Sequence, residues 1–573
     1  MIKNITFDKY KIAIISIIVT TITALFYFHI RLYIVDNHND FGEYFVRAEY
    51  WSEGILYWVA GSDKFLSLIE LIAIKLSNIH DFFNIYDNIN DVITTLMLIA
   101  IFLFLTVKNS FSIEFKVRVL TILFAFSLPF FILKGRTVDQ SYLFGIMLLL
   151  WVGVYHIRII SSIVALLVFT SRPEGVMIIP LFFLVMLVDK DNRKNIIINF
   201  ILFVLILSGY KLFDAYQHSG TYQEYQILAA GGSDLIKTGL QKIANLMLIP
   251  IYYFLLALVI LKSYLYFSLF VVGTLVSLKD KKYYIYFSIP ILYLLMLSIL
   301  SGGIIFDFQR IENYMTHNLF YFFPSVEDSS FGSTPFSNHE RYYLFSYPFI
   351  AVFVIKGVLY IIEKVYNLLK NVEFKKYQNF AIVSIVSFFS LTNILYFTQS
   401  TTKFRQGAFL QKHYQLKKVG LALRKHKNSV LNSVIIYDFC DGSMGSSLSI
   451  FSVFSGVSNL YTKTCGKTWS YAWVKGHPRP KAMPIYEPKA IAKINKQLNF
   501  KFESASIDYK FTTANIQEIN SLFQKPNYNL LTKLSIDYVI SQRKITLRGL
   551  TLVEQSRGDP KNYGNYKIYK VKK

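Results

Sequence analysis

Long apolar runs recur along the first 400 residues of the chain, and short polar turns separate them. A transmembrane helix needs about 20 predominantly apolar residues to cross ~30 Å of hydrocarbon. Many runs between Ile12 and Phe397 are long enough for this. We therefore predict a polytopic α-helical membrane protein with about eleven transmembrane helices. The predicted spans lie near residues 12–31, 92–107, 119–133, 141–155, 158–170, 175–188, 195–210, within 245–278, and near 283–300, 344–361 and 379–397.

Two segments need separate interpretation. Residues 245–278 contain enough apolar sequence for two spans, split at Lys262. The alternation of inner and outer loops allows only an odd number, so we predict one span plus a re-entrant or interfacial piece. Phe65–Leu76 is weakly amphipathic and carries Glu70 and Lys75. We expect it to lie on the outer membrane surface instead of spanning.

The distribution of Lys and Arg predicts the orientation. Short loops rich in these residues mark the cytoplasmic side of a membrane. The basic clusters lie at residues 3–11, 108–118, 190–194, 279–282 and 364–376. The segments between them, poor in bases, are then expected outside, together with the C-terminal tail. Long domains cross a membrane largely regardless of charge, so the positive tail does not oppose this orientation.

The composition changes near residue 400. Residues 401–573 hold 29 Lys and Arg against 9 Asp and Glu, which gives 29 − 9 = +20 of the total net charge of +24. Apolar runs at Val430–Tyr437, Ile536–Ile540 and Tyr566–Val571 predict strands, with helical stretches between them such as His413–Arg424 and Ala490–Leu498. We predict a membrane domain over 1–400 and a basic extracytoplasmic α/β domain over 401–573, for which nucleic acid is not an expected partner.

The most distinctive polar segment follows the first apolar run. Residues 36–57 hold five carboxylates and one Arg, in a region otherwise apolar or basic. Carboxylates repel anionic lipid head groups, so a plain connecting loop gains nothing from them. An enzyme that activates a hydroxyl nucleophile does need a carboxylate as its base. Asp40 and Glu43 stand three residues apart, so a helix would place them on one face. The structural alternative is a helix cap. We predict a catalytic first outer loop over residues 32–91.

Several cations lie at predicted outer boundaries. Arg172 stands in the tight turn Ser171–Gly175, Lys134 and Arg136 stand in another turn, and Arg341 precedes a late span. Together they would suit a lipid-linked phosphate. Taken singly, each is better explained as a surface ion pair or as a side chain that anchors a span.

No strong cofactor motif is present. The outer segment 302–341 carries His317, Glu327, Asp328, His339 and Glu340, whose spacing matches no tight metal motif. We predict no metal ligands and no cofactor, and leave a divalent ion open. Cys440 and Cys465 are too few for a Cys-only metal site; a disulfide and two separate thiols both fit. The tail has no Walker loop, dinucleotide fingerprint or nucleophile elbow.

Two patches resemble bacterial GT-C membrane glycosyltransferases. The acidic loop with Asp40, Arg47 and Trp51–Gly54 is similar to the family's Asp-Asp or Asp-Glu loop, which is followed by a Tyr/Arg helix and a Glu-Gly pair. The turn Ser171–Gly175 is similar to the Thr-Arg-Pro-Glu-Gly turn of arabinofuranosyl- and mannosyltransferase-like members.

Weaker resemblances extend over the rest of the chain. Glu340–Leu344 resembles the family's entry to a late helix, and the tail segments at 535–540, 550–553 and 566–571 resemble the closing strands of its external domain. The family often has an adjacent acidic pair, whereas here Asn39 and Phe41 flank Asp40. Asp36 and Glu43 therefore stay open as alternative bases.

The resemblance implies an inverting glycosyltransferase in the cytoplasmic membrane. It would move a sugar from a polyprenyl-phosphate donor to a cell-envelope glycan or glycolipid at the outer face. Asp40, Glu43 or Asp36 would act as the base, and Arg172, Arg136, Lys134 and Arg341 would hold the donor phosphate. The alternatives are a transporter or flippase of lipid-linked glycans, or a polymerase of such glycans.

Overall fold

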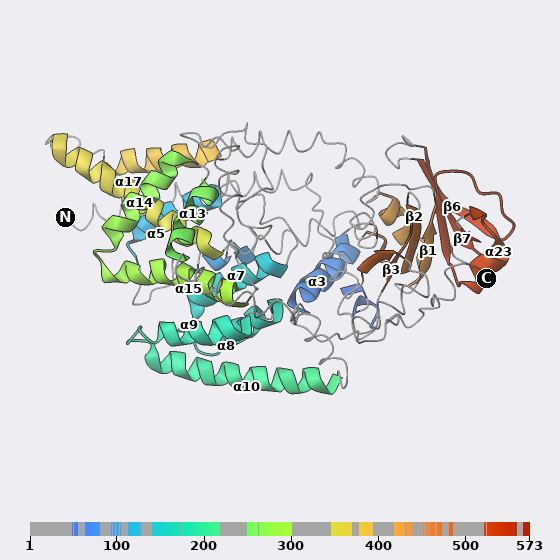
Figure 1. Cartoon of the computed structure of the whole chain (residues 1–573), viewed down its shortest axis with the longest axis horizontal. Coiled ribbons are helices and arrows are strands. Elements are labelled where there is room, and N and C mark those ends of the chain that lie inside the picture. The colour runs from blue at the N-terminus through green and yellow to red at the C-terminus, as the bar shows by residue number, and fades with distance from the viewer. Residues whose placement is uncertain are drawn as a thin grey trace, which may run out of the picture. The chain divides into compact units, whose positions relative to one another are not determined.

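A computed structural model describes the helices and strands of this chain (Figure 1). It covers residues 48–54, 64–80, 93–104, 113–127, 140–217, 249–300, 345–369, 378–393, 418–437, 451–472, 481–484, 521–557 and 565–572, with short gaps inside several of these ranges. The chain forms two compact units. The helical unit comprises residues 1–34, 90–210 and 233–405, and the mixed unit comprises 35–89, 211–232 and 406–573.

Apolar helices make up the described part of the helical unit. Continuous runs of Leu, Ile, Val and Phe favour helices of this kind when few Gly or Pro residues interrupt them. They include α5 (Phe115–Ser127), α7 (Gln140–Val154), α8 (Ile160–Ser171), α9 (Gly175–Met186), α10 (Arg193–Gln217), α13 (Ile249–Leu261), α14 (Tyr264–Ser277), the 3₁₀ turn η3 (Lys281–Tyr283), α15 (Tyr284–Leu300) and α17 (Tyr347–Leu369). The last residues of α10 are assigned to the mixed unit.

The prediction of about eleven transmembrane helices is wrong, because most of these helices are too short to cross a membrane. Among the described residues, one helix segment, Arg193–Leu212, is long and apolar enough to cross a membrane. Most others have 12 to 17 residues. At 1.5 Å per residue such helices reach about 18–26 Å, short of a ~30 Å hydrocarbon core. The 23-residue α17 is long enough but contains Lys356, Glu363 and Lys364.

The region around Lys262 also differs from the prediction of one span and a re-entrant piece. Two helices, α13 and α14, flank this position. Ser263 caps α14 by accepting a hydrogen bond from the backbone N–H of Tyr266 at 3.2 Å. A buried Ser at a helix start satisfies a donor that would otherwise have no partner. The cap explains why the chain forms two short helices here.

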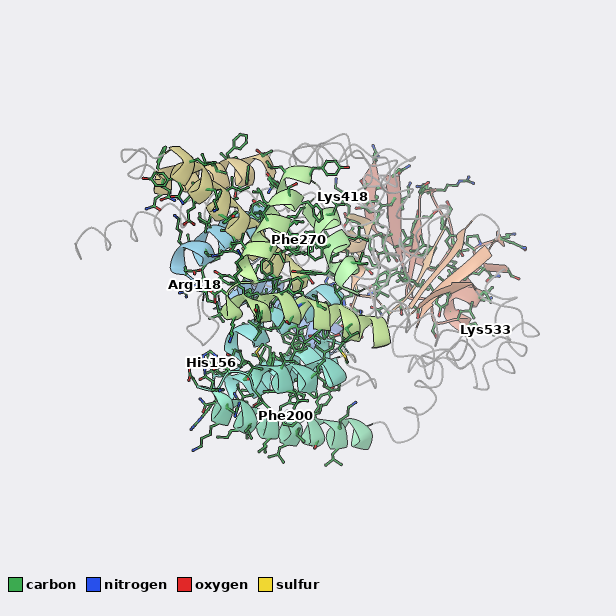
Figure 2. The ribbon with its side chains drawn as sticks, turned by 60° about the vertical axis from the view of Figure 1, so that its left-hand side comes forward. Arg118, His156, Phe200, Phe270, Lys418 and Lys533 are labelled. Atoms are coloured by element: carbon green, nitrogen blue, oxygen red, sulfur yellow. The ribbon has the colours of Figure 1, made fainter. Side chains whose placement is uncertain are left out.

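Helices α14 and α17 pack closely through a pair of glycines. A Cβ atom on Gly273 would lie 1.8 Å from the carbonyl oxygen of Phe353, and one on Gly357 would lie 2.0 Å from that of Leu269. Each glycine therefore lies directly against the backbone of the opposite helix. Phe270 is fully buried beside this crossing and contacts the rings of Tyr253 and Phe353 (Figure 2). Small residues at a crossing let two helix backbones approach closely.

Polar side chains join the loops of the helical unit. Glu114 accepts hydrogen bonds from Lys282 (2.7 Å) and from the Tyr283 hydroxyl (2.5 Å). Lys116 donates to Asn379 at 2.7 Å. These contacts bring together three segments that lie far apart in the sequence. Two of them, around residues 108–118 and 279–282, are basic clusters that the charge pattern assigns to one side.

A seven-stranded mixed sheet is the centre of the other unit, in the order β4-β3-β2-β1-β5-β7-β6. Strands β2, β1 and β5 run parallel, and both flanking sets are antiparallel. The strands are β1 (Ser433–Ile436), β2 (Asn459–Thr464), β3 (Lys467–Ala472), β4 (Lys481–Pro484), β5 (Tyr538–Ser541), β6 (Leu550–Arg557) and β7 (Asn565–Val571). Central strands β1 and β5 are buried along their whole length, as expected for a sheet covered on both faces.

Helices α3 and α23 belong to this mixed unit. The short α23 (Tyr528–Lys533) contributes Leu531 to a core that includes Ile435, Val539 and Tyr569. Helix α3 (Lys64–His80) contains the segment predicted to lie on the membrane surface. Its Glu70 is fully buried, whereas Leu68, Ile72 and Leu76 are exposed.

Three of the predicted tail strands form β1, β5 and β7. The predicted helix over His413–Arg424 is described from residue 418 onward and is helical to residue 424. The predicted helix Ala490–Leu498 and both cysteines lie outside the described residues. Strands β2, β3 and β4 were not predicted, because residues 459–484 mix Lys, Thr and Ser with apolar positions.

Candidate functional site

The acidic segment contributes one helical turn to the mixed unit. Ala48, Glu49, Trp51 and Ser52 are helical, and Gly54 ends the turn with a left-handed φ of 79°. The backbone N–H of Gly54 donates to the carbonyl of Trp51 at 3.1 Å. Glycine adopts this conformation without steric cost, so it is a natural stop for the turn. Lys75 of α3 donates to the carbonyl of Ser52 at 3.2 Å and attaches the turn to that helix.

Two cations of the C-terminal region face this turn. Arg424 ends the helical residues 418–424, and Lys427 stands in the turn that follows. Gly456 packs against both, with a left-handed φ of 64°. A Cβ atom there would lie 2.6 Å from Lys427 Nζ and 2.8 Å from Arg424 Nη1. Glycine adopts this φ without strain and lets both cations lie against its backbone.

Glu49 is at the centre of a buried ion cluster. One carboxylate oxygen pairs with Arg424 Nη2, and the other lies 3.2 Å from Lys427 Nζ. Lys427 also donates to the carbonyl of Gly456 at 2.8 Å. At the rim, Glu53 lies 3.6 Å from Lys427 and accepts a hydrogen bond from Ser429 at 2.8 Å. We call Glu49, Glu53, Arg424 and Lys427 the ion clamp.

Burial makes the clamp more than a surface ion pair. The side chains of Glu49 and Arg424 are 3% and 5% exposed, and that of Lys427 is 10% exposed. Burial alone would raise the pKa of Glu49, but the charges of Arg424 and Lys427 outweigh it and hold the pKa below 4.5. Glu49 is therefore ionised at neutral pH. A carboxylate this well paired is a poor proton acceptor, so its chemical role is to anchor and not to catalyse.

Further contacts fix the Arg424–Ser429 turn on the sheet. The Tyr538 hydroxyl of β5 donates to the carbonyl of His426, and the His426 ring lies 3.1 Å from Glu554 of β6. The clamp thus ties the acidic segment to the sheet, across 375 residues of sequence. Asp36, Asp40 and Glu43 precede this anchored turn by 6 to 13 residues (49 − 43 = 6 and 49 − 36 = 13).

Most predicted site residues lie outside the part of the chain that the structure describes. These are the three candidate bases Asp36, Asp40 and Glu43, and the three candidate phosphate ligands Lys134, Arg136 and Arg341. Their mutual geometry is therefore not tested.

Arg172 is the one predicted site residue in the described chain. It follows α8 in an extended conformation, and its N–H donates to the carbonyl of Val168 at 3.3 Å. Its own carbonyl accepts from the N–H of Gly175 at 3.1 Å, where α9 begins. The predicted tight turn between two apolar segments is therefore present. The Arg172 side chain is partly buried and has an interaction of its own.

The ion clamp was not predicted from the sequence. Glu49 and Glu53 were recognised only as members of an acidic segment, and Arg424 and Lys427 only as part of a basic tail. Charge complementarity between these two regions was the available signal. It does not identify partners, because each acidic residue faces many equally plausible cations.

The described residues contain no group of three or more His, Cys, Asp or Glu side chains that could hold a metal ion. Comparison with known proteins adds no further assignment: neither a protein-family model nor a curated protein sequence matches this chain.

Proposed function

We propose that this protein is a membrane-associated glycosyltransferase. It would move a sugar from a polyprenyl-phosphate donor to a glycan or glycolipid acceptor at the outer face of the cytoplasmic membrane. The ion clamp carries this proposal, because it joins the acidic segment that holds the candidate bases to the basic C-terminal domain. A transferase needs such a junction if the domain is to present an acceptor hydroxyl to a base in the loop.

The chemistry would proceed in one displacement. Asp40, or Glu43 or Asp36 in its place, takes the proton of the acceptor hydroxyl. The acceptor oxygen forms a bond to the anomeric carbon while the bond from that carbon to the phosphate oxygen breaks. Polyprenyl phosphate leaves with the bonding electrons, and Arg172, Arg136, Lys134 and Arg341 are the candidates to stabilise its charge. The configuration at the anomeric carbon is inverted, and the reaction requires no redox cofactor.

The outer surface of α10 supports the location at a membrane. Ile196, Asn199 and Phe203 on one face are buried. Large apolar side chains on the other face are exposed at helical spacing: Ile197, Ile201, Leu205 and Leu212. α10 lies at the edge of the helical unit beside α8 (Figure 1). Only 17% of an apolar 18-residue stretch within Arg193–Leu212 is buried. A core helix of a water-soluble protein would be mostly buried, so lipid is the better environment for this face.

The N-terminal end of α10 agrees with this assignment. Lys190, Arg193 and Lys194 are exposed at its N-terminal end, where cations can interact with lipid head groups. We expect the full-length protein to stay in membranes after alkaline extraction, and release into the soluble fraction would contradict the membrane location.

The test of the transferase is mass spectrometry of envelope glycans and glycolipids from cells that lack the protein. Wild-type protein should restore a missing sugar, and Asp40→Asn should not, at equal protein amount. Glu43→Gln and Asp36→Asn identify the base if Asp40→Asn is active. Glu363→Gln is the matched control, since Glu363 is an exposed carboxylate on α17.

Three results would revise the proposal. Full restoration by all three loop variants would remove the catalytic role from the acidic segment. Accumulation of an intact lipid-linked precursor, with all its glycosidic bonds present, would favour a flippase. Loss of transfer on treatment with a chelator would add a divalent ion to the reaction.

A further inference from the structure

A basic pocket lies at the α23 end of the mixed unit. It is a cavity of about 680 Å³, lined by residues 525–529, by Leu547–Gly549 and by Lys572. Sites for small molecules typically measure about 300–1,000 Å³. The pocket is therefore large enough for a sugar unit, and far larger than a single inorganic ion requires. Figure 2 labels Lys533, which ends the helix that forms one side of this region.

The wall of the pocket is fixed by three segments that bond to one another. Asn527 caps α23 by accepting hydrogen bonds from the N–H groups of Asn529 (2.9 Å) and Leu530 (3.4 Å). The Tyr528 hydroxyl donates to the carbonyl of Lys572 at 2.5 Å. The N–H of Lys572 donates in turn to the carbonyl of Gly549 at 2.9 Å.

Gly549 allows the aromatic ring to close this wall. It has a left-handed φ of 93°, and a Cβ atom there would lie 2.2 Å from Cε2 of Tyr528. The ring therefore lies directly against the glycine backbone. Such a wall is formed before any ligand arrives, which lowers the cost of binding.

The charge of the pocket is of one sign. Lys525, Arg548 and Lys572 line it and are exposed, and no carboxylate is among the lining residues. Within the described chain, none of these three side chains is paired with a carboxylate. Cations held around one hollow repel one another until an anion enters. The amide side chains of Asn527 and Asn529, at the same wall, offer hydrogen bonds to hydroxyl groups.

We propose that this pocket binds an anionic saccharide, through a carboxylate or phosphate that contacts the three cations and hydroxyl groups that contact the asparagines. The site is independent of the transfer reaction proposed above and needs none of its candidate bases. The experiment that tests it therefore measures binding and not glycan synthesis.

The experiment is isothermal titration calorimetry on the full-length protein in detergent. The probes are tetragalacturonate, which carries carboxylates, neutral maltotetraose and inorganic phosphate. Tetragalacturonate should bind the wild-type protein, and maltotetraose should not. Arg548→Ala and Lys572→Ala should each weaken binding about tenfold, as expected for loss of a hydrogen bond to a charged group. Arg548→Lys should recover part of the affinity.

Lys570→Ala is the matched control. Lys570 is an exposed cation two residues before Lys572 and does not line the pocket. Its loss should change the affinity less than about twofold, the level of a screened surface charge. Equal weakening by Lys570→Ala and Lys572→Ala would overturn the pocket in favour of diffuse charge. Binding of phosphate as tight as that of tetragalacturonate, or displacement by anionic phospholipid vesicles alone, would overturn the saccharide.

Discussion

The two units of this protein are held together by different kinds of contact. In the helical unit, a glycine pair brings the backbones of α14 and α17 into contact, aromatic rings fill the interior, and the outward face of α10 is apolar. In the mixed unit, a sheet supplies the core, and a buried carboxylate with two cations joins distant segments. The first unit is therefore held mainly by apolar and backbone contact, and the second by a sheet core and a buried ion cluster.

The largest expected effect is on the glycine crossing of the helical unit. Gly273→Ala places a methyl group 1.8 Å from the carbonyl oxygen of Phe353, and a backbone cannot yield as a side chain can. The helices must separate, and we expect a loss of about 3 kcal/mol or more of unfolding free energy. Thermal unfolding of the detergent-solubilised protein measures this.

Gly209→Ala is the matched control for that substitution. Gly209 lies on the exposed face of α10, and no atom lies within 4 Å of a Cβ built there. Alanine is the better helix former by up to about 1 kcal/mol, so this variant should be unchanged or more stable. A similar loss in both variants would show that the crossing has no special role.

The next effect concerns the ion clamp. Glu49→Gln removes the charge that compensates buried Arg424 and Lys427, and we expect a loss of about 3 kcal/mol, as for other broken buried pairs. Glu53→Gln, at the rim, should cost less than about 1 kcal/mol. Chemical unfolding followed by tryptophan fluorescence compares the two. Equal costs would mean that burial does not distinguish the two carboxylates.

Acid should weaken the mixed unit through the same residue. The pKa of Glu49 is lower in the folded protein than its usual 4.5, so its stabilisation is complete above pH 4.5 and disappears as the pH falls through the folded value. Unfolding free energy measured against pH should therefore fall more steeply below 4.5 in the wild-type protein than in Glu49→Gln. Parallel curves would assign the acid sensitivity to other groups.

The smallest expected effect is on the exposed ion pair between Glu114 and Lys282 in the helical unit. Burial raises the pKa of Glu114, but hydrogen bonds from Lys282 and Tyr283 lower it to about 2. The Glu114 side chain is 47% exposed, so water and salt screen the pair, and Lys282→Ala should cost only a few tenths of a kcal/mol. High salt should remove that difference while the cost of Glu49→Gln persists. A salt-independent cost for Lys282→Ala would contradict the comparison.

The sequence pattern predicted much of the secondary structure. The apolar run expected near 141–155 forms α7 at Gln140–Val154, and the runs at 536–540 and 566–571 form β5 and β7. Hydrophobic runs reveal an element because its buried side chains recur at fixed spacing. They do not reveal its length, since caps and turns end helices inside a continuous apolar run. Ser263 does so between α13 and α14, where one span was predicted and two short helices form.

The candidate site was less predictable. The acidic segment was found from its charge, and the turn at Arg172 from its Pro and Gly residues. The partnership of Glu49 with Arg424 depends on the sheet that carries the Arg424–Ser429 turn, and no local pattern encodes it. The basic pocket likewise combines three segments whose proximity depends on Gly549 and on the end of β7.

The order of synthesis gives the ion clamp a further meaning. Glu49 leaves the ribosome early, but its two cations follow more than 370 residues later, and β7, which lies between β5 and β6, follows later still. The mixed unit therefore cannot close before β7 has been synthesised. A nascent chain must carry an unpaired acidic turn until the downstream sheet arrives.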